Sequence, residues 1–561
     1  MKSLLLKNKI PKQYYILGCI LIYAFILRML NITERGLLHY DEAWYANEAK
    51  SIIYGLKYFL NHLSNFINGT VDFSEFRSYV ISYSSSIAGS SGKIFFNILS
   101  SVSAVLFGNV MVGMSLLSIG FNVASCLMVY LISRHIFKDE TVSLVAAFVF
   151  SVSSISIWYA RSPLSQSMSV FFVLLATYVI FGSNHNRKIL VIAISLALGI
   201  LCHPNILPSV ALIGLIIFIG EIYTEKASVK SIAKVMLVLL LVIVIAVYLF
   251  GLISKVPYFL VGGNSEVISS QIDNTDVILR RSRTINAFSI ELFLDFVAKS
   301  VVQLINSEGI LVLFFSIGLI WACYSKIQEA NYKAMLLVLL PLIVILIWAV
   351  SCVHFRDRLL YQVYPFIAMS TAYGIIVLFR FLKTNILKSK KIVIALVICL
   401  SLYCSFTGII RSKKIASISN LKNFMQLKVR LDTYVGLYGG NLIVHQGHLF
   451  PQIAYFFARD NLKGYKNLEN NIIRDGRKIS QKQFPFNHGD FVIIPRIKGN
   501  SKELFGTDTV PDKHKMNLLV EKNNPVFSIP YTGSEGESPD PFTFNPNVGT
   551  FDVYDLRMIG L

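Results

Sequence analysis

The sequence is poor in cysteine and in acidic residues. Its seven cysteines all lie in or beside apolar segments, and residues 411–561 contain none, so no disulfide can stabilise that polar region. The cysteine spacing matches no zinc-site pattern, and we expect these residues to serve as small buried apolar side chains. A glycine-rich phosphate loop is also missing, so nothing indicates a nucleotide site.

The deficit of acidic residues leaves a net charge of +20, from 52 Lys and Arg against 32 Asp and Glu. A nucleic-acid-binding protein would gather such charge on one basic face, whereas here the basic residues stand between hydrophobic runs. Hydrophobic residues make up 54% of the 561, and the mean hydropathy is +0.59, which is more apolar surface than a soluble fold can bury. The composition therefore predicts a polytopic α-helical membrane protein with membrane lipids, and no nucleic acid, as partners.

Apolar runs long enough to cross a bilayer recur along the first 410 residues. A span needs about 17 to 25 apolar residues, and this criterion predicts about eleven transmembrane helices. The candidates cover residues 14–30, 112–131, 141–158, 167–182, 189–202, 206–222, 235–254, 309–325, 334–352, 362–382 and 392–410. Lysines precede the first run as in a secretory signal, but no small-residue cleavage site follows it, so we interpret it as a retained span.

The basic residues predict the topology of these spans. Short connections rich in Lys and Arg alternate with poorer ones, which places the N-terminus in the cytoplasm and, with an odd number of spans, the C-terminus outside. Two long loops, 31–95 and 255–305, then lie on the outer side. We expect a transmembrane domain over residues 1–410 and an extracytoplasmic soluble domain over 411–561, in a multi-pass protein of the plasma membrane.

The outer segments carry patterns of their own. Residues 288–297 have apolar side chains at helical spacing, which favours a helix along the membrane surface, with ordinary loop packing as the alternative. The C-terminal segment contains strand-like runs at 441–445, 490–495 and 550–554, and a helix-like stretch at 451–459. About 150 residues suffice for a small α/β domain with its own core.

The run His39–Ala49, directly after the first span, carries the strongest indication of chemistry. Adjacent carboxylates at a membrane exit, Asp41 and Glu42, are costly to desolvate, so they need water or a function. On a helix they diverge by about 100°, so they need not share a role. One of them in a partly dry cleft can act as a general base. Alternatively, Asp41 caps a surface helix and Glu42 is favourable in its first turn.

The run also resembles a family motif. Asp-Glu-Ala-x-Tyr-x-x-x-Ala at 41–49, which includes Tyr45, is similar to the first-loop motif of membrane glycosyltransferases of the GT-C fold, in the group of protein O-mannosyltransferases and lipid A aminoarabinose transferases. Later segments agree in order over roughly residues 14–382. They are Gly92–Phe96 followed by Phe107-Gly108, then Tyr159–Gln166, then Arg358–Pro365. The prolines that follow the family's lysine are missing, and so is the frequent acid of the second external loop, where Gln166 stands.

This resemblance implies the transfer of one sugar, with inversion, from a polyprenyl-phosphate donor to a lipid, glycan or protein acceptor outside the cytoplasm. Asp41 would be the base, supported by Glu42. The leaving phosphate gains charge, so cations near it favour the transition state. The candidates at external ends of spans are Lys93, Arg161, Arg356 and Arg358, for which the alternative role is that of interfacial anchors.

Further expectations concern the sugar and the metal. His203 stands at an external helix end and can donate a hydrogen bond to a sugar, although a helix-ending turn before Pro204 is the alternative. Tyr45, within the first-loop motif, is a further candidate for substrate binding. A divalent metal collects several oxygen ligands, and Gln166 replaces the acid of some relatives, so we expect a metal-independent reaction without a cofactor.

Two other classes of function fit the same sequence. A transporter or lipid flippase would have a similar number of spans, but transport usually places ionisable residues near the middle of spans, which here are almost free of them. The departures from the family motifs also allow a scaffold in envelope assembly that has lost its activity. The gathering of charge at external span ends favours the enzyme.

Overall fold

The structure is a computed structural model. It describes residues 11–38, 40–70, 72, 74–76, 79–80, 93–182, 188–203, 240, 244, 248, 289–328, 332–350, 357–385, 390–438, 442–444, 455, 466–467, 491–497, 524–531 and 549–555. The predicted spans 206–222 and 235–254 and most of the loop 255–305 lie almost entirely outside these residues, as do Arg356 and the stretch 451–459 apart from Tyr455.

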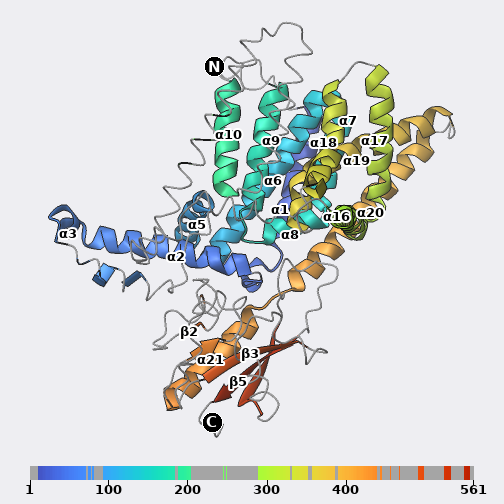
Figure 1. The fold of residues 1–561 in the computed structure, drawn as a ribbon. Helices are drawn as coiled ribbons and strands as arrows, with labels where there is room; N and C mark the ends of the chain where they lie inside the picture. Colours follow the sequence, from blue (N-terminus) through green and yellow to red (C-terminus); the bar gives the residue numbers. More distant parts are fainter. Residues whose placement is uncertain are drawn as a thin grey trace, which may run out of the picture.

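The described part is mostly helical, with a bundle of apolar helices that run side by side (Figure 1). The bundle contains α1 (Lys12–Met29), α6 (Val110–Phe137), α7 (Glu140–Val152), α9 (Gln166–Gly182), α10 (Lys188–Cys202), α17 (Leu311–Gln328), α18 (Tyr332–Val350) and α19 (Asp357–Asn385). The helix α20 (Lys390–Ser417) runs from this bundle towards the C-terminal sheet.

The bundle is that of a multi-pass membrane protein. Among the described residues, four helices are long and apolar enough to cross a membrane, or up to six if each sharply bent helix pair is counted as one span. The remaining apolar helices of the bundle, such as α9 and α10, are shorter. Each predicted span within the described residues coincides with one or two of these helices, and the total of about eleven stays a prediction.

One predicted span, 141–158, consists of two helices. The helix α7 ends at Val152, and α8 (Ser154–Arg161) leaves it at 58°. Ser153 causes this break, because its backbone is extended and its hydroxyl accepts a hydrogen bond from Ser156 N at 3.3 Å, as an N-cap residue does. The break turns α8 across the end of the bundle, where Arg161 is its last residue.

Two bundle helices, α17 and α19, meet through glycine. A Cβ on Gly318 would overlap the carbonyl oxygen of Ser370, and one on Gly374 would overlap that of Phe314. The two backbones therefore touch, which is the small-residue packing on which helices rely in a membrane. This contact fixes the position of α19, whose first turn carries Arg358.

Four further helices lie outside the parallel bundle. They are α2 (Tyr40–Asn61), α3 (Leu63–Ile67), α5 (Ile94–Phe107) and α16 (Ile290–Glu308). Figure 1 shows α2 lying across one end of the bundle, with α5 beside it. The amphipathic pattern around residue 290 forms a helix as predicted, and α16 meets α17 at 120°. A short 3-10 helix, Ile32–Glu34, leads from α1 towards α2.

The C-terminal unit consists of α21 (Leu421–Tyr438) and a five-stranded mixed sheet of order β2-β1-β3-β5-β4. The strands are β1 (Leu442–Val444), β2 (Lys466–Asn467), β3 (Phe491–Ile497), β4 (Phe527–Tyr531) and β5 (Gly549–Asp555). The strand β1 pairs in parallel with β2 and β3, and β5 pairs antiparallel with β3 and β4. The unit lies at the same end of the bundle as α2 (Figure 1). The predicted boundary at residue 410 falls inside α20, and the helices break at residues 418–420.

Candidate active site

Asp41 and Arg358 lie in contact although they are 317 positions apart in the sequence. Asp41 is in the first turn of α2 and Arg358 in the first turn of α19, and Arg358 Nη1 donates to Asp41 Oδ2 at 2.8 Å. The side chains are 26% and 14% exposed, respectively. The contact therefore joins the start of α2 to the start of a bundle helix, and both side chains remain partly exposed.

Two tyrosines border this ion pair. Tyr45 and Tyr159 are both buried and both interact electrostatically with Arg358. The ring of Tyr45 meets Phe96 edge to face, with 5.9 Å between centroids, and the ring of Tyr159 stacks on Tyr361 at 4.8 Å. The aromatic rings hold α2, α5, α8 and α19 together around the ion pair, as such pairs commonly do in a core.

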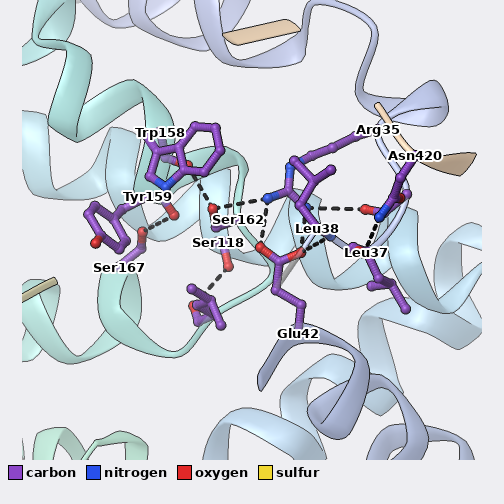
Figure 2. Close-up of polar contacts among 12 residues, drawn as sticks. Arg35, Leu37, Leu38, Glu42, Ser118, Trp158, Tyr159, Ser162, Ser167 and Asn420 are labelled. Atoms are coloured by element: carbon purple, nitrogen blue, oxygen red, sulfur yellow. Dashed lines mark hydrogen bonds and ion pairs between the residues drawn. The ribbon is translucent and has the colours of Figure 1, made fainter. Parts of the chain in front are cut away.

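The second carboxylate, Glu42, lies in a buried cluster with Arg35, Leu38 and Ser162 (Figure 2). Arg35 binds it with both terminal nitrogens, at 2.7 and 2.6 Å, and the backbone N–H of Leu38 donates to it at 2.8 Å. Both side chains are at most 2% exposed. Arg35 also donates to Ser162 Oγ at 3.1 Å and lies 6.0 Å from the centroid of Trp158. Glu42 thus fixes the start of α2 against the end of α8.

The connection from α8 to α9 is held rigidly beside this cluster. Ser118 on α6 donates to the carbonyl of Leu164 at 3.2 Å, and Ser167 donates to the carbonyl of Tyr159 at 3.1 Å (Figure 2). Ser162 donates to the carbonyl of Trp158 at 3.0 Å. Hydrogen bonds from Ser118, Ser162 and Ser167 therefore hold the connection between α8 and α9, which ends just before Gln166, the first residue of α9.

A second polar group contains Gln166, His203 and Lys93. Nε2 of Gln166 and Nε2 of His203 are 3.3 Å apart, and both residues are buried. Lys93 directly precedes α5, is 3% exposed, and lies near Cys202, the neighbour of His203. The side-chain oxygen of Gln166 has no hydrogen-bond partner among the described residues. On the same helix, Phe96 lies one turn after Lys93 and touches Tyr45 of α2.

Arg161 is fully buried and binds the end of α1. Its Nη1 donates to the carbonyl of Arg28 at 2.9 Å and to that of Leu30. Its Nε and Nη2 have no partner among the described residues. Arg161 therefore satisfies helix-end carbonyls that a membrane would otherwise leave unpaired.

Of the predicted site residues, Asp41 and Arg358 bind each other, His203 lies beside Gln166, and Glu42 and Arg161 form separate buried contacts with Arg35 and with the end of α1. Sequence reasoning gave no role to Arg35. It also gave no role to Glu48, whose buried carboxylate accepts hydrogen bonds from Trp44 Nε1 at 2.9 Å and from Asn97. The seven-residue spacing from Asp41 to Glu48, two helical turns, is the signal that could have indicated it. Among the described residues, no group of three metal-ligating side chains occurs.

Comparison with known proteins gives matches in structure alone. No family model matches the sequence, and no curated protein matches it. ArnT from Cupriavidus metallidurans, in a crystal structure with bound undecaprenyl phosphate, matches with a TM-score of 0.52 and 10% identity, over 96% of this chain and 97% of ArnT. Its apo structure matches with a TM-score of 0.50 over the same shares. The oligosaccharyltransferase of Archaeoglobus fulgidus, in complex with Zn and sulfate, matches with a TM-score of 0.50 and 13% identity.

The chain has the GT-C fold. The match with ArnT spans nearly the whole of both chains, whereas 79% of this chain covers only 61% of the archaeal enzyme. Within the GT-C fold, the segments on which the sequence resemblance rested lie at one end of the bundle. They are the start of α2, the start of α5, the end of α8 and the start of α19. The fold therefore brings together residues that the sequence places far apart.

Proposed function

We propose that this protein is a glycosyltransferase that moves one sugar from a polyprenyl-phosphate donor to an acceptor on the outer side of the plasma membrane, with inversion. The observation that carries the proposal is the contact between Asp41 and Arg358. A carboxylate and a guanidinium, both partly exposed, meet there at the external end of the bundle in a GT-C fold. The bound undecaprenyl phosphate in the similar ArnT structure supports the class of donor.

The proposed reaction is a single displacement. Asp41 takes the proton from an acceptor hydroxyl or amine while its oxygen or nitrogen attacks the anomeric carbon from the face opposite the phosphate. The bond between that carbon and the phosphate oxygen breaks, and its electron pair remains on the polyprenyl phosphate. One displacement inverts the anomeric centre. The donor phosphate competes with Asp41 for Arg358, which frees the carboxylate to act as the base.

Arg358 and Lys93 are the cations that we assign to the leaving phosphate, because they lie at the starts of α19 and α5, two of the segments that carry the family resemblance. Cations at the position where negative charge develops lower the barrier. His203 and Tyr45 are assigned to the sugar. Glu42 and Arg161 act beneath the site, since their contacts join α1, α2 and α8. Arg356 is also assigned to the phosphate, because it lies two residues before Arg358 in the sequence.

The acceptor is a lipid, a glycan or a protein, and the reaction proceeds without a metal or cofactor. We propose no metal because Gln166, at the start of α9, stands where some GT-C enzymes carry an acid. The N-terminus is cytoplasmic in this proposal, so the start of α2 and the C-terminal unit are outside. They lie at the same end of the bundle, as this topology requires (Figure 1).

Turnover of the Asp41→Asn variant tests the proposal. Purified protein is supplied with polyprenyl-phosphate sugars and a panel of acceptors, and transfer is measured against Asp72→Asn, an exposed first-loop aspartate that binds Ser74. We expect Asp41→Asn to lose about 100-fold or more in transfer rate, as general bases do, and Asp72→Asn to retain it. Near-normal transfer by Asp41→Asn removes Asp41 from the mechanism. Movement of the intact donor across vesicles without transfer would replace the enzyme by a flippase.

A further inference from the structure

The segment between α20 and α21 lies directly on the backbone that precedes α2. Asn420 N donates to the carbonyl of Arg35 at 3.2 Å, and Asn420 Nδ2 donates to that of Leu37 at 2.6 Å (Figure 2). Ser419 Oγ donates to the carbonyl of Glu34. Three hydrogen bonds thus attach residues 419 and 420, which we call the linker, to residues 34–37.

The linker and residues 34–37 pack so closely at Gly36 that no side chain fits between them. Gly36 has a φ of +73°, and a Cβ there would overlap Asn420 Oδ1 and lie 2.9 Å from Leu421 N. Only glycine fits both the left-handed backbone and this contact. Asn420 is fully buried, and its side-chain oxygen has no partner among the described residues, so its amide acts here as a donor.

The same short segment controls the start of α2. Arg35 binds Glu42 with two hydrogen bonds, and Leu38 N donates to the same carboxylate. Glu42 is the neighbour of Asp41, so a displacement of residues 35–38 moves the first turn of α2 and with it Asp41. On its other side, the linker begins α21, where Phe424 N donates to the carbonyl of Asn420 at 3.0 Å. The helix α21 in turn packs on the sheet, with Arg430 located 5.6 Å from the ring centroid of Phe527.

We propose that Asn420 is a positioning residue for Asp41: the C-terminal unit, docked through the linker, sets the start of α2 and keeps Asp41 in place for transfer. This inference rests on the proposed function for its effect on catalysis. Its structural part, a mechanical connection from the linker to α2, is independent of what the site does. Contacts between the linker and α2 show coupling only if one substitution in the linker changes both the start of α2 and the transfer reaction, so the test measures both.

Asn420→Asp is the most informative variant. It is nearly isosteric and keeps the backbone carbonyl that accepts from Phe424 N at the start of α21, but it replaces the donor to the Leu37 carbonyl by a carboxylate oxygen. The matched control is Ser417→Ala, which removes an exposed hydroxyl that binds only the carbonyl of Lys414 in its own helix. Ser419→Ala is the milder variant, because it removes one bond to the first-loop segment and leaves Asn420 intact.

Two measurements test the proposal on the full-length protein in detergent or nanodiscs. We expect Asn420→Asp to raise deuterium uptake in the peptide covering residues 34–45 several-fold and to leave uptake in α6 unchanged. We also expect kcat to fall about tenfold, since small misplacements of a reacting group cost up to about 100-fold, with the KM for the donor unchanged. Ser419→Ala should show the same pattern at smaller size, and Ser417→Ala should match the wild type.

Unchanged uptake over residues 34–45 in a folded Asn420→Asp protein would overturn the inference, and so would a fall in kcat with equal loss of donor binding. If Asn420→Asp does not fold, Ser419→Ala decides by the same criteria. If the wild type transfers no sugar yet uptake over residues 34–45 rises in the variants, the mechanical connection stands and the proposed function fails.

Discussion

Arg28 on α1 forms a hydrogen bond with α8, and Arg161 on α8 forms hydrogen bonds with the end of α1. Arg28 on α1 donates to the carbonyl of Ser151 at 2.9 Å and to the hydroxyl of Ser156 at 2.8 Å, on the two sides of the break between α7 and α8. Arg161 at the end of α8 donates to the carbonyls of Arg28 and Leu30, where α1 ends. Both arginines are fully buried. The helix pair α7–α8 and the helix α1 therefore stabilise each other at one end of the bundle.

This exchange predicts the effect of removing Arg161. Arg161→Ala leaves two carbonyls at the end of α1 unpaired, and hydrogen bonds between helices in membranes contribute about 1 kcal/mol each. We expect a loss of about 1 to 3 kcal/mol, seen as a lower unfolding temperature of the purified protein. Arg134→Ala is the control, because its ion pair with Glu140 is exposed and contributes little. Equal unfolding temperatures of the two variants would contradict the structural role of Arg161.

The buried pair of Arg35 and Glu42 predicts a non-additive mutant cycle. Removal of one partner leaves an uncompensated buried charge, so Glu42→Gln and Arg35→Gln should each destabilise the protein by about 3 to 5 kcal/mol. The double variant removes both charges and should recover part of that loss. Unfolding in denaturant measures all three. Additive losses would show that the two side chains do not depend on each other.

The proposed role of Arg358 predicts a graded series. Arg358→Lys keeps a cation with fewer donors and should lose about tenfold in transfer rate, and Arg358→Ala should lose about 100-fold or more. Arg380→Ala, near the other end of the same helix, removes an exposed ion pair with Asp139 and should leave transfer unchanged. Steady-state rates with a polyprenyl-phosphate sugar measure the series. Full activity in Arg358→Ala would exclude the assignment to phosphate.

The contact of α17 with α19 predicts opposite effects at two glycines. Gly374→Ala forces a methyl group into the carbonyl of Phe314 and should destabilise the protein by about 1 to 3 kcal/mol. Gly120 on α6 has nothing within 4 Å of its would-be Cβ. Gly120→Ala should therefore be neutral, or stabilising by up to about 1 kcal/mol. Thermal unfolding in one detergent compares the two variants, and a stable Gly374→Ala protein would refute the close packing.

The proposed mechanism, which uses no metal, predicts that transfer is insensitive to chelators. Transfer in excess EDTA should equal transfer in untreated protein, and added divalent ions should not change the rate. A loss of activity that one specific divalent ion restores would overturn this part of the proposal. The Gln166→Glu variant extends the test, because it supplies the acid that this chain lacks, and a metal dependence that appears only there would locate the difference at this position.

Long apolar runs made the bundle predictable from the sequence. The runs at 112–131, 167–182 and 362–382 became α6, α9 and α19, and the GT-C resemblance is confirmed for the fold. β-branched runs likewise predicted β1, β3 and β5. The strand β4 was missed because it is short and contains Pro530. The helix α5 was missed because it has 14 residues, fewer than a span requires.

The site was less predictable, because its contacts depend on backbone geometry that no sequence pattern encodes. The placement of Asp41 near external cations followed from topology, and its contact with Arg358 is observed. The partner of Glu42 could not be predicted. Gly36, which follows Arg35, has a left-handed backbone. The packing of Asn420 against Gly36 explains why glycine is needed there, and the sequence does not reveal this packing. The contact of Gly36 with Asn420 joins segments that lie far apart in the sequence, so no local pattern could have indicated it.

The attachment of the linker to the first loop also bears on biosynthesis. Asn420 binds the carbonyl of Leu37, 383 positions earlier in the chain. At about 5 to 20 residues per second, the ribosome makes that stretch in roughly 20 to 80 seconds. During this interval residues 34–37 already exist while their partner residues 419 and 420 do not. A nascent chain therefore lacks the hydrogen bonds that fix residues 34–37 until residue 420 has been made, and the start of α2 takes its final position only at that late stage.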